Sequence, residues 1–295
     1  MEIGIWWVNF FNCSKRDLLL NLMSKSGCVC CGKESDFREY IRYQNETVFS
    51  RYEGTVIGKC AGCGTLKTFP KTNAVFDPQE NHTRVYEKDI RKFEKLFQPI
   101  IDRVKHYKPA GRILDVGCAT GILLSMFKKE GYDITGIEPN REEYRKAKKR
   151  LGSVVINTTI NIYTRKHRKK FDVIVYNHVL EHIDDINNEL TQAKKILKPG
   201  GLIVVGLPNT GNIIFLIRKK YWEFLMPTQH VWHFGKKQIR QLLQKNGFKI
   251  IDTSYSDDNR IDYPLAKKIY FRCLSFINRL LNTGEAQLLV ALKIP

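Results

Sequence analysis

The segment RILDVGCATG, residues 112–121, decides the fold of this 295-residue chain. Its first half, Arg112 to Val116, has the short apolar pattern of a buried strand, and Gly117 and Gly121 follow at once. Apolar residues at helical spacing then continue to Glu130. Glycine tolerates a positive φ and has no side chain, so the backbone at such a turn can approach a ligand closely. The segment therefore predicts a strand, a ligand-binding turn and a helix, in that order.

The same alternation continues on the C-terminal side of this turn. Alternating strands and helices are typical of a parallel, doubly wound α/β sheet. We expect strands at 134–138, 171–176, 202–207, 248–253 and 287–293, and helices at 142–151, 185–197 and 236–246. On the N-terminal side, apolar residues among charges predict an amphipathic helix from Val85 to Tyr107, which ends before Pro109.

An acidic residue ends the second of these strands. Glu138 lies 21 residues beyond Gly117, and a carboxylate at this place can accept hydrogen bonds from both hydroxyls of a ribose. A glycine-rich turn alone can be a tight connection between a strand and a helix. Together with Glu138 it predicts a nucleoside-binding site.

Two C-x-x-C-G sequences, residues 28–32 and 60–64, precede this part of the chain. Tetrahedral zinc takes four thiolates, and two such turns supply them in pairs, here Cys28, Cys31, Cys60 and Cys63. Cys30 could compete with either neighbour, but the spacing to the trailing glycine favours Cys28 and Cys31. Four thiolates leave no open position, so the zinc is expected to be structural. The alternative is a set of buried free cysteines.

The turn also carries a family resemblance. Residues 115–121, DVGCATG, resemble motif I of class I methyltransferases, usually D-x-G-x-G-x-G, with Ala119 at the middle glycine. The resemblance continues in order through residues 171–174, 179–183, 197–201 and 208–209 and covers 111–295. It implies a Rossmann-like, mostly parallel seven-stranded sheet that binds S-adenosylmethionine. The implied cofactor-binding residues are Asp115, Gly117, Cys118, Ala119, Gly121, Glu138 and Asn177.

The chain departs from this pattern near its third strand. The acidic residue that often holds the adenine amino group is absent around Ile156, where Asn157, Thr158 and Thr159 stand instead. The zinc ribbon ahead of the fold is similar to that of deoxysugar methyltransferases, and also to that of ribosomal RNA guanine methyltransferases. Both acceptor classes remain open at this point.

Two histidines are candidates for the chemistry. Methyl transfer is an in-line displacement, and a general base helps when the acceptor is a hydroxyl. His230 follows the fifth strand, where sugar C-methyltransferases with this zinc module carry Glu-His, but Gln229 replaces the glutamate and favours O-methylation. A structural or acceptor-binding role is the alternative for His230. His182 is the second candidate, with a structural role as its alternative. Quinone O-methyltransferases carry Glu-x-x-Glu-His here, which raises a divalent metal at His178, Glu181 and His182 as a further alternative.

Charge and apolar content bound the partners. The net charge is +19 and favours anionic partners such as phosphorylated sugars, anionic lipid or RNA, although a merely solvated basic surface is the simplest interpretation. We expect no transmembrane segment and no signal peptide, and therefore a cytoplasmic protein. A helix between Asp262 and Thr283 with apolar and basic sides is expected to be core or lid, with contact to a membrane surface as the alternative.

These observations predict four parts: an N-terminal segment 1–24, a zinc-ribbon module 25–75, a linker helix 76–110 and a methyltransferase domain 111–295. The expected function is O-methylation of a small hydroxylated acceptor, such as a nucleotide- or lipid-linked sugar. An RNA base methyltransferase and a quinone-type O-methyltransferase are the alternatives.

Overall fold

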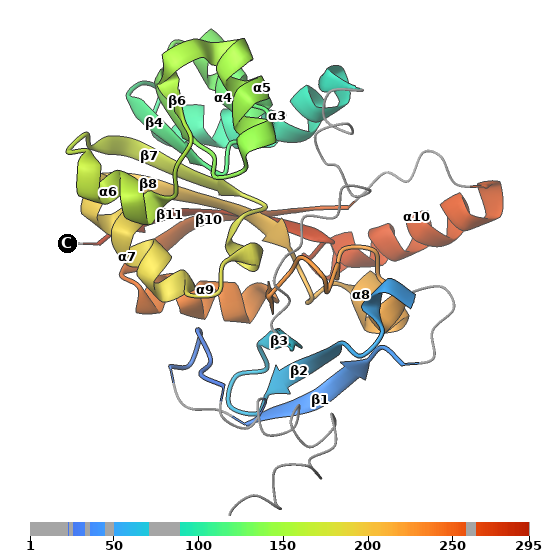
Figure 1. Ribbon diagram of the computed structural model, residues 1–295. Coiled ribbons are helices and arrows are strands. Elements are labelled where there is room, and N and C mark those ends of the chain that lie inside the picture. Colours follow the sequence, from blue (N-terminus) through green and yellow to red (C-terminus); the bar gives the residue numbers. More distant parts are fainter. Residues whose placement is uncertain are drawn as a thin grey trace, which may run out of the picture.

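A computed structural model describes residues 23, 26–32, 36–44, 50–70, 89–257 and 264–294. Its centre is a seven-stranded sheet in the order β10-β11-β8-β7-β4-β5-β6 (Figure 1). The four pairings among β4, β5, β6, β7 and β8 are parallel, and β11 joins β8 and β10 antiparallel. The expected Rossmann-like, mostly parallel seven-stranded α/β fold is confirmed. Its strands are β4 (Arg112–Val116), β5 (Asp133–Ile137), β6 (Val155–Ile156), β7 (Phe171–Asn177), β8 (Leu197–Pro208), β10 (Phe248–Ser256) and β11 (Ala286–Lys293).

Helices cover both faces of this sheet (Figure 1). Because side chains alternate along a strand, Ile113 and Val173 face one helical layer, whereas Leu114 and Ile174 face the other. The first layer holds α3 (Ile90–Tyr107), α4 (Ile122–Lys129) and α5 (Arg141–Leu151). The second holds α6 (Ile160–Lys166), α7 (Ile186–Ile196) and α9 (Lys236–Lys245).

The helix expected at 85–107 is present as α3 over its described part, and residues 85–88 lie outside the described residues. Its apolar side, Ile100, Ile101 and Val104, packs in the same core as β4 and α4. The strand expected at 202–207 begins earlier, at Leu197, where it pairs with Phe171 before a register shift. Of the segment 1–24, only Met23 is described, and it is buried.

A second sheet lies beneath the first and combines distant parts of the chain (Figure 1). Its antiparallel order is β1-β2-β3-β9. The first three strands, β1 (Phe37–Arg42), β2 (Val56–Cys60) and β3 (Leu66–Phe69), belong to the cysteine-containing region, and β9 (Trp232–His233) comes from beyond β8. Trp232 and Phe37 lie in one continuous core with β4, α7 and α9. The cysteine-containing region is thus built into the larger fold through β9.

Two further helices complete one end of the molecule, α8 (Ile213–Arg218) and α10 (Leu265–Leu280), with short 3-10 turns η1 (Ser50–Tyr52), η3 (Gly152–Val154), η4 (Leu180–His182) and η5 (Lys219–Tyr221). None of the described helices is both long and apolar enough to cross a membrane.

Candidate functional site

The glycine-rich turn and Glu138 form one hydrogen-bonded unit. The Ala119 N–H donates to Glu138 Oε2 at 2.9 Å, and the Asn140 N–H donates to Oε1 at 2.7 Å. Each carboxylate oxygen thus has one backbone donor and one lone pair left for a ligand hydroxyl. Glu138 is buried, and this burial raises its pKa to about 7 although both backbone donors favour the ionised form.

The turn keeps its shape with alanine at the middle position. Ala119 adopts a φ of +46°, a left-handed conformation that costs roughly 1–2 kcal/mol for a residue with a Cβ. Gly117 and Gly121 also have positive φ, and a Cβ on Gly117 would lie 2.7 Å from Val179 Cγ2. The close approach of Val179 therefore requires glycine at 117, whereas position 119 accepts alanine and uses its N–H to hold Glu138.

Asp115 lies next to Glu138 in the buried floor of the site. Burial raises the pKa of Asp115 to about 8, and the negative charge of Glu138 adds to the increase. Cys118 is buried, and its Sγ would lie 2.8 Å from a Cβ placed on Gly136 of β5. Two carboxyls with raised pKa values at the ends of adjacent parallel strands mark a candidate ligand site.

Asn177 ends β7, beside the end of β4. Its Oδ1 would lie 2.7 Å from a Cβ on Gly206, so only glycine at 206 leaves room for this side chain. His178, with φ +54°, follows at once and its N–H donates to Gly206 O at 2.8 Å. Of the three residues near the third strand, Asn157 uses its side-chain amide within the protein. Its Nδ2 donates to Glu138 O and Pro139 O, so this amide group supports the backbone around Glu138.

A cluster of imidazoles lies just beyond Asn177. His230 is buried, and its Nδ1 lies 3.1 Å from Phe224 O, which assigns the proton to Nδ1 and leaves the Nε2 lone pair available. His182 is exposed, its Nδ1 lies 3.0 Å from Gln229 O, and its ring meets that of His230 edge to face at 4.8 Å between centroids. Burial, with His182 and His233 nearby, holds the pKa of His230 well below 6.5. His230 is therefore neutral at neutral pH.

Glu181 contacts this cluster through both its side chain and its backbone. It is buried, its Oε1 accepts from His178 Nδ1 at 3.2 Å, and its backbone oxygen accepts from Val231 N–H at 2.9 Å. Its Oε2 has no hydrogen-bond partner among the described residues. A divalent metal at His178, Glu181 and His182 is the alternative that the sequence leaves open; in the structure, ligand atoms of Glu181, His182 and His230 lie within 4.8 Å of one another. These three side chains could bind a cation, or His230 could accept a proton, but His230 cannot do both with the same nitrogen.

One functional neighbour of His230 was missed by the sequence reasoning. Thr68, on β3, is buried; its Oγ1 donates to His230 O at 2.8 Å and lies 2.9 Å from His233 Nε2. The Thr68 N–H also donates to Val231 O at 2.9 Å. Since Thr68 and His230 are separated by 162 positions in the chain, no local pattern could have indicated the contact. The cysteine-containing sheet thereby holds the backbone of the histidine segment.

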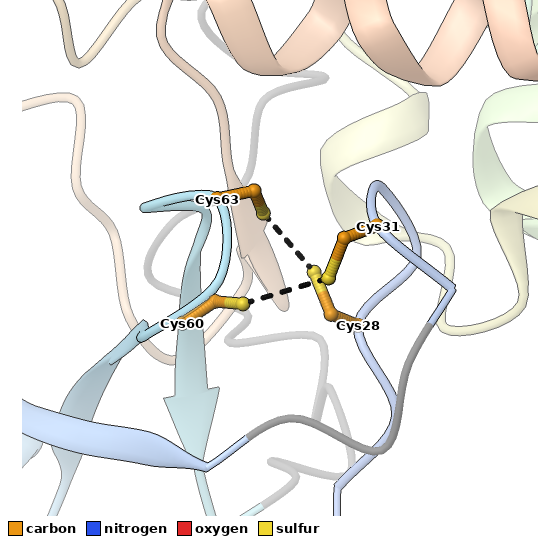
Figure 2. A group of neighbouring side chains, drawn as sticks. All are labelled: Cys28, Cys31, Cys60 and Cys63. Carbon is orange, nitrogen blue, oxygen red and sulfur yellow. Dashed lines mark hydrogen bonds between the residues drawn. The ribbon is translucent and has the colours of Figure 1, made fainter.

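The four expected cysteines converge, as Figure 2 shows. Their sulfurs lie within 4.8 Å of one another, with Cys28 Sγ 3.5 Å from Cys63 Sγ and Cys31 Sγ 3.8 Å from Cys60 Sγ. A tetrahedral zinc with Zn–S bonds of about 2.3 Å separates its sulfurs by roughly 3.8 Å, so this set fits such an ion. Gly32 and Gly64 close the two turns, each donating its N–H at 2.9 Å to the oxygen of the first cysteine. Cys30 lies beside the Cys28 and Cys63 thiols, and its Sγ donates to Gln238 O on α9 at 3.5 Å.

Comparison with known proteins decides the family. A family model described as "Methyltransferase domain" matches residues 81–253, more than half of the chain. The chain belongs to this family. It is an S-adenosylmethionine-dependent class I methyltransferase, in agreement with the fold and the turn at 115–121. The matched region includes α3, whose apolar side chains pack in one core cluster with β4 and α4.

Individual relatives are more distant. The chain is 34% identical to a ubiquinone biosynthesis O-methyltransferase from a Bradyrhizobium strain over 33% of this chain and 40% of the relative. It is 26% identical to the protein of the same name from Yersinia enterocolitica, over 56% of this chain and 78% of the relative. The Bradyrhizobium match thus spans less than half of that relative's length. A methyltransferase structure from Archaeoglobus fulgidus shares the fold, with a TM-score of 0.55, 19% identity, and coverage of 72% of this chain and 100% of the other.

The Glu138 carboxylate gives a first prediction. Glu138→Ala should weaken S-adenosylmethionine binding at least tenfold, because hydrogen bonds to charged groups contribute roughly 1.5–3 kcal/mol each. Affinity of the unsubstituted protein should rise as pH increases through about 7, since the ionised carboxylate is the better acceptor and its pKa is raised to that value. Isothermal titration calorimetry between pH 6 and 8 measures both. Glu142→Ala, on the exposed start of α5, is the matched control, and equal affinity of the two variants would remove Glu138 from the site.

Proposed function

We propose that this methyltransferase transfers the methyl group of S-adenosylmethionine to a hydroxyl of a small acceptor, with His230 accepting the hydroxyl proton. The cofactor supplies an electrophilic methyl group on a sulfonium. In this proposal the cofactor site is lined by Asp115, Gly117, Cys118, Ala119, Gly121, Glu138 and Asn177. The Glu138 carboxylate accepts hydrogen bonds from the ribose hydroxyls. The observation that carries the proposal is the contact of His230 Nδ1 with Phe224 O, because it presents the basic Nε2 of a neutral imidazole.

His182 has a supporting part in this proposal. Its Nδ1 is directed to Gln229 O, next to His230 in the chain, and its ring lies edge to face against the His230 ring. It therefore fixes where the His230 ring stands. His182 is itself exposed.

Two acceptor classes are favoured by different observations. The zinc module ahead of the fold resembles that of sugar methyltransferases and supports a nucleotide- or lipid-linked sugar. A phenolic hydroxyl, as in a quinol precursor, has a pKa near about 10 and gives up its proton to a neutral imidazole more readily than a sugar hydroxyl does. The names of the relatives, ubiquinone biosynthesis O-methyltransferases, agree with the second class.

The metal belongs to the proposal as well. Cys28, Cys31, Cys60 and Cys63 would hold one structural zinc, with no open position for substrate. Zinc thiolates of this kind require reduced cysteines, which supports a cytoplasmic location.

Methyl transfer from tritium-labelled cofactor tests the acceptor class. The purified protein is incubated with separate pools of sugar nucleotides, quinol precursors and RNA, and label is followed into each. Label in a small hydroxylated compound supports the proposal if it survives alkali, which cleaves methyl esters, and is released as methyl iodide by hydriodic acid, which cleaves methyl ethers but not carbon–carbon bonds. Label confined to RNA would overturn it.

A further inference from the structure

The exposed apolar side chains of the described residues are concentrated on α10 and α8. Ten of the fifteen exposed large apolar side chains belong to these two segments. On α10 and the residue after it they are Leu265, Ile269, Tyr270, Phe276, Ile277, Leu280 and Leu281, with exposed fractions from 38% to 72%. On α8 and η5 they are Leu216, Ile217 and Tyr221. Figure 1 shows α10 running outward beside α8 at one end of the molecule.

The helical geometry makes this surface a continuous stripe. At 100° per residue, Leu265, Ile269, Phe276 and Leu280 fall within about 60° of arc along a helix roughly 24 Å long. The opposite side is already packed: Phe271, Leu274 and Asn278 are buried, and α10 contacts α8 there. Asn278 fixes the helix, since its Oδ1 accepts from Ile213 N–H at 3.0 Å and its Nδ2 donates to Asp257 Oδ1 at 2.8 Å. The stripe is therefore the outer face of a firmly docked helix.

The charge around this stripe has one sign. Residues 264–283 contain Lys267, Lys268, Arg272 and Arg279 and no acidic residue, and Arg218, Lys219 and Lys220 follow α8 without an acidic neighbour up to Trp222. The acidic groups close by are engaged: Glu223 pairs with Arg218 at 3.0 Å, Glu285 accepts from Trp222 Nε1 at 2.8 Å, and Asp257 accepts from Asn278 Nδ2 at 2.8 Å and from the Glu285 N–H at 2.9 Å. A second copy of this chain would bring the same positive charges face to face, which disfavours a dimer through this surface.

We propose that the α8–α10 surface binds the surface of an anionic lipid bilayer, with the apolar stripe inserted among the acyl chains and the Lys and Arg side chains at the headgroups. A helix with a strongly apolar side and flanking basic residues lies in the interface plane in this way. The packed side of α10 is connected to the segment that carries the base candidate, since Trp222 lies in one core cluster with Phe271 and Leu274, packs against Phe224, and Phe224 O contacts His230. A lipid-borne acceptor would thus meet the enzyme on the side where its hydroxyl is needed, a consequence that rests on the proposed function; binding to the bilayer does not.

Sedimentation with vesicles tests the proposal on the full chain. Vesicles of phosphatidylcholine mixed with phosphatidylglycerol should bind the protein, and vesicles of phosphatidylcholine alone should bind it far more weakly. Lys268→Gln, Arg272→Gln and Arg279→Gln combined should lower partitioning about a hundredfold, because each basic residue near an anionic surface contributes roughly a factor of five. Leu265→Ser, Ile269→Ser and Phe276→Ser combined should also abolish most binding, and these exposed positions are not needed for folding.

Matched controls lie on α6. Arg165→Gln, Lys166→Gln and Arg168→Gln remove three exposed charges from the helix and the residues after it, and Ile162→Ser removes an exposed apolar side chain there; neither change should alter partitioning. If the α6 variants lose as much vesicle binding as the α10 variants, the binding is general charge attraction and not specific to the α8–α10 surface. Absence of vesicle binding, or light scattering that shows a dimer dissolved by the α10 apolar variant, would overturn the proposal. S-adenosylmethionine binding is measured on the same proteins. A protein that fails to bind the cofactor contradicts the proposed function, whereas failure to bind vesicles contradicts only the membrane proposal.

Discussion

Replacement of His230 by alanine should lower turnover by about 10²–10⁴-fold while S-adenosylmethionine affinity stays near normal, because a general base acts in the transition state. The structure gives the reason for this separation. The imidazole is held by Phe224 O and by the backbone contacts of Thr68, none of which belongs to the turn around Ala119 and Glu138. Steady-state kinetics with the identified acceptor, together with calorimetry for the cofactor, measure the two effects.

The pH profile adds a second readout for the same residue. The pKa of His230 is held well below 6.5, so the base should stay neutral and turnover should not fall as pH drops from 8 to 6.5 for lack of a proton acceptor. His182→Ala is the neighbouring control and should have the smaller effect on turnover. If His182→Ala abolishes turnover in a folded protein and His230→Ala is harmless, the base is His182 and the assignment is reversed.

Replacement of Cys60 by serine should remove the zinc and reduce turnover at least tenfold, with cofactor binding retained. Zinc binding is coupled to the folding of small modules of this kind. Cys60 ends β2, which pairs with β3, and β3 holds Val231 and His230 through Thr68. Disorder at the cysteines should therefore reach the base. Elemental analysis after metal-replete expression should find one zinc per chain in the unsubstituted protein and none in the variant.

Two controls keep this result interpretable. Cys273→Ser changes an exposed cysteine on α10 and should alter neither zinc content nor turnover. Thr68→Val leaves the four cysteines intact but deletes the hydroxyl that contacts His230 O and His233, so it should lower turnover and keep the zinc, and Thr68→Ser should restore turnover. A zinc-free Cys60→Ser protein with full turnover would show that the sheet does not position the base.

Local chemistry explains why much of this protein could be predicted without a structure. The turn at 117–121 needs glycine for its backbone, Glu138 ends a strand at a fixed distance from it, and the C-x-x-C-G pairs place two thiolates on each turn. These are relations between residues close in the chain, so spacing alone indicates them. The alternation of strands and helices likewise predicted the parallel sheet, which the structure contains. The family match agrees with the methyltransferase resemblance of the turn at 115–121.

The contacts between distant segments could not be predicted in this way. β9 is two residues long and joins the cysteine-containing sheet, Thr68 contacts the His230 segment, and Cys30 Sγ contacts Gln238 O on α9. The outer face of α10 is also a tertiary result, since an apolar stripe reads as core until packing shows which side is covered. The sequence by itself determined the fold class, the cofactor turn and the four cysteines, because backbone conformation and ligand spacing are local. Only the tertiary structure decided which histidine is buried beside the site and which apolar surface stays exposed, because both depend on which segments burial brings together.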